Sequence, residues 1–363
     1  VGQRKDLILR GESLSVVVNA NTWTDAEAQS VALGGHLATI NDGAENNFLL
    51  VGKDRAIQKM GGDGFYWLGI NDADQNGSYT WSSGQRGTND YRSWYPGEPS
   101  GYDVWGPEHY GFTINFLDGD ICEKQNGYWY DTTLTGNGYI SKGLAEIPFI
   151  RRGDSAYVVV QGPTWEEAEA NAVKLGGHLV TINDADENKW IAQNFGFGNS
   201  QDWKFWIGMT NDGKASDWQS QNWQWVSGET SQYREWHADQ PWIYDDSKYA
   251  FINLPTQNVN PTQGEGAWVP YRDYFAYDWS NGIYGIREPK GIAEIKLGSD
   301  FLVAAGSARL TVNPDNDAPT GNLGIDVTGT ASDVVSNDPS ALGFGDVKGA
   351  VSALGLGGSN PAR

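Results

Sequence analysis

Few side chains in this chain could catalyse a reaction. The 363 residues include four histidines and a single cysteine, Cys122. His36 and His178 occupy the same position in two copies of a repeated segment, so we expect both to support the scaffold. His109 and His237 have no cysteine or histidine partner at the spacing of a zinc site. The sequence also lacks a Gly-x-Ser-x-Gly elbow, which positions the nucleophile of many hydrolases.

Acidic pairs are the remaining catalytic candidates. Neighbouring carboxyl groups such as those of Asp245 and Asp246 could hydrolyse a glycosidic bond. Acidic loops are abundant in this chain, so we interpret these pairs as solvated carboxylates. We therefore expect a binding protein and not an enzyme, and the 17 tryptophans supply rings that could stack on sugars from surface loops.

Composition limits the partners and the location. The formal net charge of −21 argues against nucleic acid, because a basic patch could not outweigh it. The single cysteine excludes an intrachain disulfide, and the sequence has no apolar run of about 20 residues that would predict a membrane span. The acidic surface fits an extracellular or cell-surface protein. Because the chain begins at Val1 without a signal peptide, we expect a piece of a longer protein.

One folding unit occurs twice. Residues 33–42 return as residues 175–184 with a single change, from Ala38 to Val180. Further pairs match in the same order: Trp23 and Trp165, Glu45 and Glu187, Trp67 and Trp206, Trp94 and Trp236, and Glu146 and Glu294. A repeat of this length is a whole domain and not a solenoid coil. Shared features are expected to be scaffold, and features of one copy are candidates for function.

Local signals predict the same elements in each copy. Residues 13–19 alternate and are rich in valine, which favours a strand. Thr22 and Asp25 form a capping signal for a helix that a Gly-Gly pair ends. Asp42 and Glu45 open a second helix, and short Trp-rich strands separated by turns follow. The fold class is therefore α+β, with two helices, small antiparallel sheets and a long loop region in each copy.

The repeat also sets the domain limits. We expect the first domain over residues 1–150 and the second over residues 151–297. Each contains a long irregular segment, residues 82–110 in the first and residues 227–248 in the second. Loops of this length in compact domains are usually functional when they are ordered, and their Trp, Tyr and Pro content argues for order.

The C-terminal segment, residues 298–363, has a different composition in which Gly, Ala, Ser, Asn and Asp dominate. We expect a strand within residues 301–312 and a linker at residues 316–321. The remainder is interpreted as irregular chain or as a partial further module.

Both copies resemble C-type lectin-like domains over residues 12–150 and 154–297. The resemblance rests on the first helix with its Trp and Ala residues, the Leu-Gly-Gly-His-Leu-Ala-Thr-Ile segment, the segment Trp94-Tyr-Pro-Gly-Glu-Pro99 and the final Ala-Glu-Ile strand. The disulfides usual in animal members are absent, so the resemblance is to bacterial members. Residues 313–321 are also similar to junctions in large bacterial surface proteins, which implies a fragment of a surface adhesin.

The resemblance implies a Ca²⁺ and sugar site in the long loop of the first copy. Glu98, Pro99 and Ser100 stand where sugar-binding members have a ligand triplet with a cis proline. Glu108 is at the position of a later carboxylate ligand in these members. Asp131 is at the position of the final aspartate ligand, in the last strand motif. Glu98, Ser100, Glu108 and Asp131 are therefore the candidate Ca²⁺ ligands, because Ca²⁺ prefers six to eight oxygens. The Glu-Pro triplet resembles the mannose-type version, which favours equatorial vicinal hydroxyls.

Two of the usual amide ligands are replaced in this loop, by Ser100 and by Tyr130. The Tyr130 side chain is a poor ligand, and Asp90 or Asp103 could take its place. The alternative interpretation is a loop held by proline packing with solvated carboxylates.

The second copy lacks most of this set. Its triplet is Gln240-Pro241-Trp242, and Lys248 lies near the position of the later glutamate. The last strand would carry either Trp268-Val269-Pro270 or Trp279-Ser280-Asn281. We expect Trp236 to pack in the core, because Trp94 repeats it, and Trp242 to contact a ligand at the surface.

Two functions of different classes follow. The first is an extracellular adhesion module that binds glycans with the help of Ca²⁺, in which tandem domains raise avidity. The second is a structural or protein-binding subunit of a filament, surface layer or phage fibre, which self-assembles or binds surface proteins through Trp-rich loops.

Overall fold

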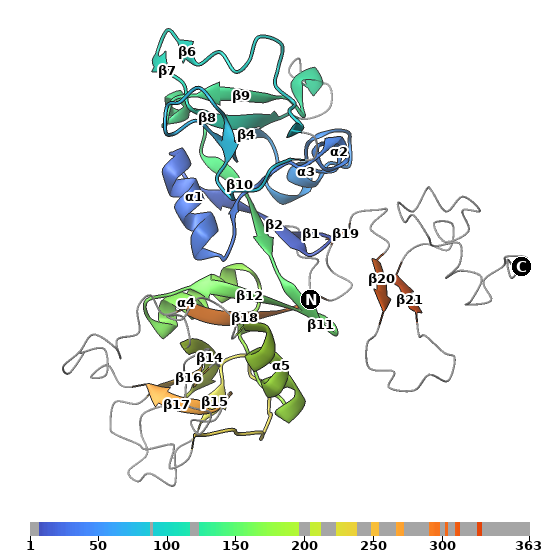
Figure 1. Cartoon of the computed structure of the whole chain (residues 1–363), viewed down its shortest axis with the longest axis vertical. Coiled ribbons are helices and arrows are strands. Elements are labelled where there is room, and N and C mark those ends of the chain that lie inside the picture. The colour runs from blue at the N-terminus through green and yellow to red at the C-terminus, as the bar shows by residue number, and fades with distance from the viewer. Residues whose placement is uncertain are drawn as a thin grey trace, which may run out of the picture. The chain divides into compact units, whose positions relative to one another are not determined.

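The computed structural model describes most of the chain. It covers residues 7–87, 90–116, 123–195, 204–211, 223–237, 248–253, 266–271 and 290–297, and the short strands β19 (Leu302–Val303), β20 (Arg309–Val312) and β21 (Ile325–Thr328). The chain divides into two compact units, residues 1–302 and residues 303–363. The first unit contains both copies of the repeat, in the order shown in Figure 1.

Within the described residues, the first half of this unit has three helices and a mixed sheet. The helices are α1 (Trp23–Ala32), α2 (Gly43–Leu50) and α3 (Ala56–Met60), with 3-10 turns at Glu123–Gln125 and Gly136–Gly138. The strands are β1 (Leu7–Arg10), β2 (Ser13–Asn19), β3 (His36–Leu37), β4 (Gly64–Asn71), β5 (Thr80–Trp81), β6 (Tyr102–Asp103), β7 (Gly106–Pro107), β8 (Tyr110–Asn115), β9 (Trp129–Thr132) and β10 (Lys142–Pro148).

The second half repeats the pattern. Its helices are α4 (Trp165–Lys174) and α5 (Ala185–Phe195). Its strands are β11 (Ile150–Arg152), β12 (Ser155–Gln161), β13 (His178–Leu179), β14 (Lys204–Thr210), β15 (Gln224–Trp225), β16 (Tyr249–Asn253), β17 (Trp268–Tyr271) and β18 (Lys290–Lys296). In the part of the chain that the structure describes, no helix is long and apolar enough to cross a membrane.

The two sheets have the same topology. In the first half the strands follow the order β1-β2-β10-β4-β8-β9, and in the second β11-β12-β18-β14-β16-β17. The last strand of each half, β10 or β18, is antiparallel to the early strand beside it and parallel to β4 or β14. The small antiparallel sheets that we expected thus also contain one parallel contact in each half, because the final strand inserts between two earlier ones.

The helix starts follow their capping residues. The Thr22 side chain accepts from the amide of Asp25 at 3.1 Å, and the Asp42 side chain accepts from that of Glu45 at 2.8 Å. A complete capping box forms at α4, where the Glu167 side chain also reaches the amide of Thr164. The α+β class is confirmed, but α3 is an addition to the two predicted helices of the first half. It is five residues long and buries Ala56 and Ile57, which is too short for periodicity to reveal.

A close approach explains the second glycine of the repeated Leu-Gly-Gly-His segment. A Cβ atom on Gly35 would lie 2.0 Å from the carbonyl oxygen of Glu146. One on Gly177 would lie 1.9 Å from that of Glu294. Each glycine therefore lets the turn after the first helix lie directly against the last strand of its half.

A buried Asn–Trp pair joins the second helix to the strand of the candidate site. The Nε1 of Trp129 donates to Asn46 Oδ1 at 3.0 Å, and Trp268 donates to Asn188 Oδ1 at 2.8 Å in the second half. Asn46 also donates to the carbonyl of Gly127 at 2.9 Å. The side chain of Trp129 is fully buried, so the position of β9 is fixed from inside the core.

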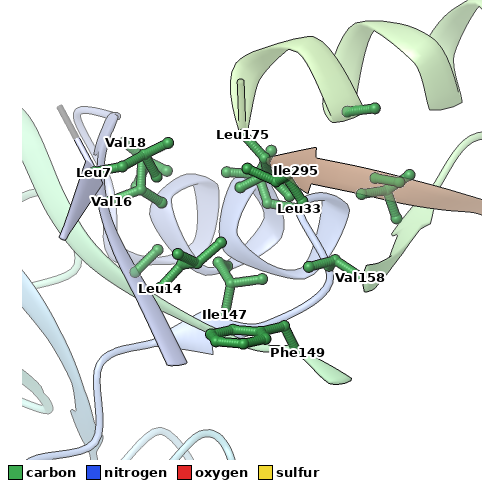
Figure 2. Close-up of a cluster of buried hydrophobic side chains, with 14 of the residues drawn as sticks. Leu7, Leu14, Val16, Val18, Leu33, Ile147, Phe149, Val158, Leu175 and Ile295 are labelled. Carbon is green, nitrogen blue, oxygen red and sulfur yellow. The ribbon is translucent and has the colours of Figure 1, made fainter. Parts of the chain in front are cut away.

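One hydrophobic cluster is shared by the two halves (Figure 2). Figure 2 labels Leu14, Leu33 and Ile147 from the first half and Val158, Leu175 and Ile295 from the second. A Cβ atom on Gly34 would lie 2.1 Å from the carbonyl oxygen of Val159, so the backbones of the halves also meet. Each half has a further core of its own. Burial of each Leu or Ile contributes about 1.5–3 kcal/mol, so the shared cluster couples the halves energetically.

The predicted domain limits stay a prediction, although β10 ends at Pro148 and β11 begins at Ile150. In the C-terminal segment, β20 pairs antiparallel with β21. The predicted strand within residues 301–312 is two strands, β19 and β20. The predicted linker at residues 316–321 lies outside the described residues.

Candidate functional site

The long loop of the first half is fixed to β9 by backbone hydrogen bonds. The amide of Trp129 donates to the carbonyl of Ser93 at 2.8 Å, and the amide of Tyr95 donates to that of Trp129 at 2.9 Å. The Trp94 ring packs edge-on against Trp129 with 5.9 Å between the ring centroids. Downstream of this anchor, the Glu98–Pro99 peptide bond is cis, as the resemblance implied, and Pro99 is exposed.

Asp131 is the buried centre of the candidate site. It lies on β9, and only 4% of its surface is exposed. Its Oδ1 accepts from the amide of Ser100 at 2.9 Å, and its Oδ2 accepts from the amide of Gly101 at 2.8 Å. The Tyr79 hydroxyl donates to the same Oδ2 at 2.7 Å. A charged acceptor with three donors holds the loop after Pro99 against the strand.

Ser100 connects the remaining carboxylates. Its hydroxyl donates to Glu108 Oε2 at 2.7 Å, and its amide also donates to Glu98 Oε2 at 3.0 Å. Glu108 is 5% exposed and Glu98 is half-buried. The structure therefore brings Glu98, Ser100, Glu108 and Asp131 together at one place. Among the described residues, no group of three or more His, Cys, Asp or Glu side chains is already arranged around a metal position.

Crowding of these carboxyl groups changes their pKa values. Burial, with the neighbouring Asp131 carboxylate, raises the pKa of Glu98 to about 7. Burial also raises the pKa of Glu108 to about 7. The hydrogen bond from Ser100 lowers this pKa and the negative charge of Asp131 raises it, but burial has the largest effect. Burial alone would raise the pKa of Asp131, but hydrogen bonds from Glu98, Tyr79 and two amides outweigh it and lower that pKa. A bound cation would relieve the repulsion between these carboxylates. Without a cation, one or two bound protons relieve it.

Tyr130 packs away from the carboxylates. Its ring stacks between Tyr95 at 5.2 Å and Phe112 at 5.4 Å, on the side of β9 opposite to Asp131. Asp103 and Asp90 were the two suggested substitutes for the missing ligand. Asp103 interacts with Glu108 and raises its pKa. The backbone amide of Asp90 donates a hydrogen bond to the carbonyl of Gly87.

An exposed hairpin beside the site was missed by the sequence reasoning. Strands β6 and β7 pair Tyr102 with Pro107 and Asp103 with Gly106. The hairpin presents Tyr102, Val104 and Trp105 to solvent and stands at the outer end of the first half in Figure 1. The available signal was a segment of aromatic and β-branched residues between two glycines, which favours a short hairpin.

Within the part of the second half that the structure describes, the ligand set is not reproduced. Strand β17 is the counterpart of β9, because Trp268 bridges Trp236 as Trp129 bridges Trp94. Of the two alternatives for the last strand, the structure thus places Trp268-Val269-Pro270 there. Ala250 pairs with Pro270 where Gly111 pairs with Asp131, so a proline replaces the central carboxylate.

Among the aromatic residues of the second half, Trp236 packs against the core of that half, as expected, 5.0 Å from Trp223 and 5.8 Å from Trp268. Trp242, the predicted surface contact, lies outside the described residues, as do Asp245, Asp246 and Cys122.

The described histidines have structural contacts. The Nδ1 of His36 donates to Glu27, and that of His178 donates to Glu169 at 2.6 Å, so the repeated pair belongs to the scaffold, as expected. The Nδ1 of His109 lies 3.4 Å from Asp72 Oδ2.

Comparisons with known proteins identify the family of both halves. A family model described as the lectin C-type domain matches residues 19–133 and again residues 161–250. The secretory phospholipase A2 receptor of Bos taurus is 25% identical over 246 residues, which are 66% of this chain and 16% of the receptor. C-type lectin domain family 6 member A of Mus musculus is 30% identical over 118 residues, 30% of this chain and 53% of that protein.

Among solved structures, the cow C-type carbohydrate-recognition domain of CD23, determined in the presence of a GlcNAc2Man3 oligosaccharide, is 19% identical with a TM-score of 0.32. The match covers 41% of this chain and 97% of that one. This chain thus spans about a sixth of the first relative and about half of the second.

Proposed function

Because the family match covers more than half of its residues, this chain belongs to the C-type lectin domain family, and we propose that its first domain binds neutral glycans with Ca²⁺. The observation that carries the proposal is the convergence of Glu98, Glu108 and Asp131 on Ser100. These residues come from two ends of a loop and from a strand, and the fold brings them together although they repel one another.

The residues at this place fit Ca²⁺ by their chemistry. Every candidate ligand of the set Glu98, Ser100, Glu108 and Asp131 offers oxygen, which is the donor that Ca²⁺ prefers. When bound, the ion would neutralise the carboxylates and offer coordination positions to two vicinal sugar hydroxyls. The chain's own residues fix the position: Asp131 holds the loop through two amides, and Ser100 orients Glu108.

The sugar preference follows from the triplet. Glu98 with Pro99 is the mannose-type version, so we propose binding of sugars with equatorial vicinal hydroxyls, such as mannose. We further propose an extracellular or cell-surface location, a role in adhesion through surface glycans, and no enzymatic activity. The origin in a bacterial adhesin also stays a proposal, because it rests on the missing cysteines and on residues 313–321, whereas the relatives named above are mammalian.

A calcium titration on a glycan array tests the proposal. We expect retention of the full chain on mannose-terminated glycans with Ca²⁺, loss in EDTA, and competition by mannose but not by galactose. Glu98→Gln should abolish retention, and Glu235→Gln, an exposed loop residue of the second half, should leave it unchanged. Equal retention with and without Ca²⁺, or full retention by Glu98→Gln, contradicts the proposal.

Two observations favour a second candidate, the structural or protein-binding subunit. Pro270 takes the register position of the central carboxylate in the second half, and the shared cluster around Leu33 and Leu175 joins the two halves through buried contacts. Sedimentation of the chain with and without EDTA, in the absence of sugar, tests this role. Self-association that no monosaccharide alters would support assembly in place of glycan binding.

A further inference from the structure

The β6–β7 hairpin begins and ends at the carboxylate cluster. The amide of Glu108 donates to the carbonyl of Gly101 at 3.0 Å and closes the base of the hairpin. The amide of Gly101 also donates to Asp131. The hairpin and the candidate ligand set are therefore one continuous structure, and a ligand bound at Glu108 would lie next to the hairpin.

The tip of the hairpin exposes apolar side chains that the fold does not use. Tyr102 and Trp105 are each 70% exposed and Val104 is 90% exposed. The amide of Trp105 donates to Asp103 Oδ1 at 2.6 Å, which orders the turn that carries these side chains. A single exposed apolar residue is ordinary, but three on one short hairpin beside a binding site indicate a contact surface.

Charge selects the kind of partner. Glu98, Asp103, Glu108 and Asp131 surround the base of the hairpin, and the chain carries a net charge of −21. An anionic partner, such as a phosphate headgroup, would be repelled here. A neutral ring with one apolar face, such as a pyranose, can stack on an aromatic side chain without that cost.

We propose that Tyr102 and Trp105 form a second sugar subsite, which stacks on the ring next to the sugar held at Glu98, Glu108 and Asp131. The tip lies two residue pairs beyond Gly101 and Glu108, about 7 Å along the hairpin at about 3.3 Å per residue. That reach suits the neighbouring unit of an oligosaccharide. This inference rests on the proposed function and adds to it a preference for oligosaccharides over monosaccharides.

Calorimetric titration of the full chain in Ca²⁺ with methyl α-mannoside and with a set of mannose disaccharides tests the subsite. We expect at least one disaccharide to bind roughly tenfold more tightly than the monosaccharide, as expected for one stacked ring. Trp105→Ala should remove this advantage and leave the monosaccharide affinity unchanged. Trp105→Phe should retain most of it, because the ring is kept.

The matched control is Tyr139→Ala, which removes an aromatic ring that is 73% exposed in a different loop. It should change neither affinity. Equal affinity of the native chain for both sugar sizes, or a tenfold disaccharide advantage that survives Trp105→Ala, overturns the subsite. Binding of the native chain, but not of Trp105→Ala, to neutral phosphatidylcholine vesicles, together with equal affinity for both sugar sizes, would assign the hairpin to a lipid surface and also overturns the subsite. If neither sugar binds in Ca²⁺, the proposed function itself fails, which is a separate result.

Discussion

Ser100 and Asp131 are joined across 31 positions of sequence by a hydrogen bond of 2.9 Å from the serine amide to the aspartate Oδ1. The next amide, of Gly101, donates to the other oxygen of the same carboxylate at 2.8 Å. A single buried charge on β9 thus fixes two consecutive peptide groups of the long loop. The loop depends on β9 for its conformation, and β9 depends on Asn46 and the core.

Asp131→Asn should therefore weaken the loop and abolish Ca²⁺ binding together. The amide side chain removes the charge that strengthens three hydrogen bonds, so we expect a loss of about 1–3 kcal/mol in the free energy of unfolding. Denaturant unfolding with and without Ca²⁺ measures both effects. Asp25→Asn, an exposed aspartate on α1, serves as the control. Equal stabilisation of the native chain and of Asp131→Asn by Ca²⁺ would contradict the assignment.

Ca²⁺ binding should release protons near neutral pH. Glu98 and Glu108 both have pKa values raised to about 7, so each is about half protonated at pH 7. A cation displaces these protons, and we expect about one proton released per ion at pH 7 and an apparent affinity that falls below that pH. Calorimetry in two buffers of different ionisation enthalpy counts the protons. Glu98→Gln should release fewer of them than the native chain does.

The free energy of unfolding of the cation-free chain should decrease as pH rises, whereas the Ca²⁺ affinity should increase. Because these two pKa values are raised from about 4.5 to about 7 in the folded state, the folded chain holds more protons than the unfolded chain between those values. Their contribution to the free energy of unfolding therefore decreases as pH rises from about 4.5 to about 7. Thermal melts in EDTA across this range measure it, and the double variant Glu98→Gln with Glu108→Gln should flatten the slope.

Gly35→Ala should be strongly destabilising. Its Cβ would lie 2.0 Å from a backbone oxygen, which requires movement of the last strand and costs at least about 1–3 kcal/mol. Gly177→Ala should behave alike, because the second half repeats the contact. Gly43→Ala is the control, since its Cβ would meet Tyr91 at an ordinary 3.6 Å. Urea midpoints of the three variants decide whether the close approach or the amino acid type matters.

The two halves should unfold in one transition. Leu33 and Leu175 belong to the shared cluster, and Leu33→Ala should cost about 2–5 kcal/mol while keeping a single transition. Leu50→Ala, in the separate core of the first half, is the comparison. Two separate calorimetric transitions in the native chain would show that the halves are independent.

The repeated elements were predictable because local chemistry determines them. The capping residues Thr22 and Asp42 mark both helix starts, and the alternation over residues 13–19 gives a strand with the bounds of β2. The parallel contact between β10 and β4 was not predictable, because local sequence does not determine between which earlier strands the final strand inserts.

The site was predictable only in part. The positions of Glu98, Glu108 and Asp131 followed from the resemblance, but their hydrogen bonds through Ser100 depend on the folded loop. The shared cluster was also missed, because Leu33 and Leu175 read as core positions within each copy. The hairpin at Tyr102 has strands of only two residues, too short for any periodicity to register.

If the first half binds sugar as proposed, the presence of Pro270 at the register position of Asp131 limits the valency of the molecule. A duplicated fold would suggest two sugar-holding positions per chain, but among the described residues the carboxylate that organises the loop is found in the first half, and Pro270 takes its register position in the second. One chain would then bind one glycan terminus at a time. Firm attachment to a glycan-coated surface would then require many chains arrayed side by side.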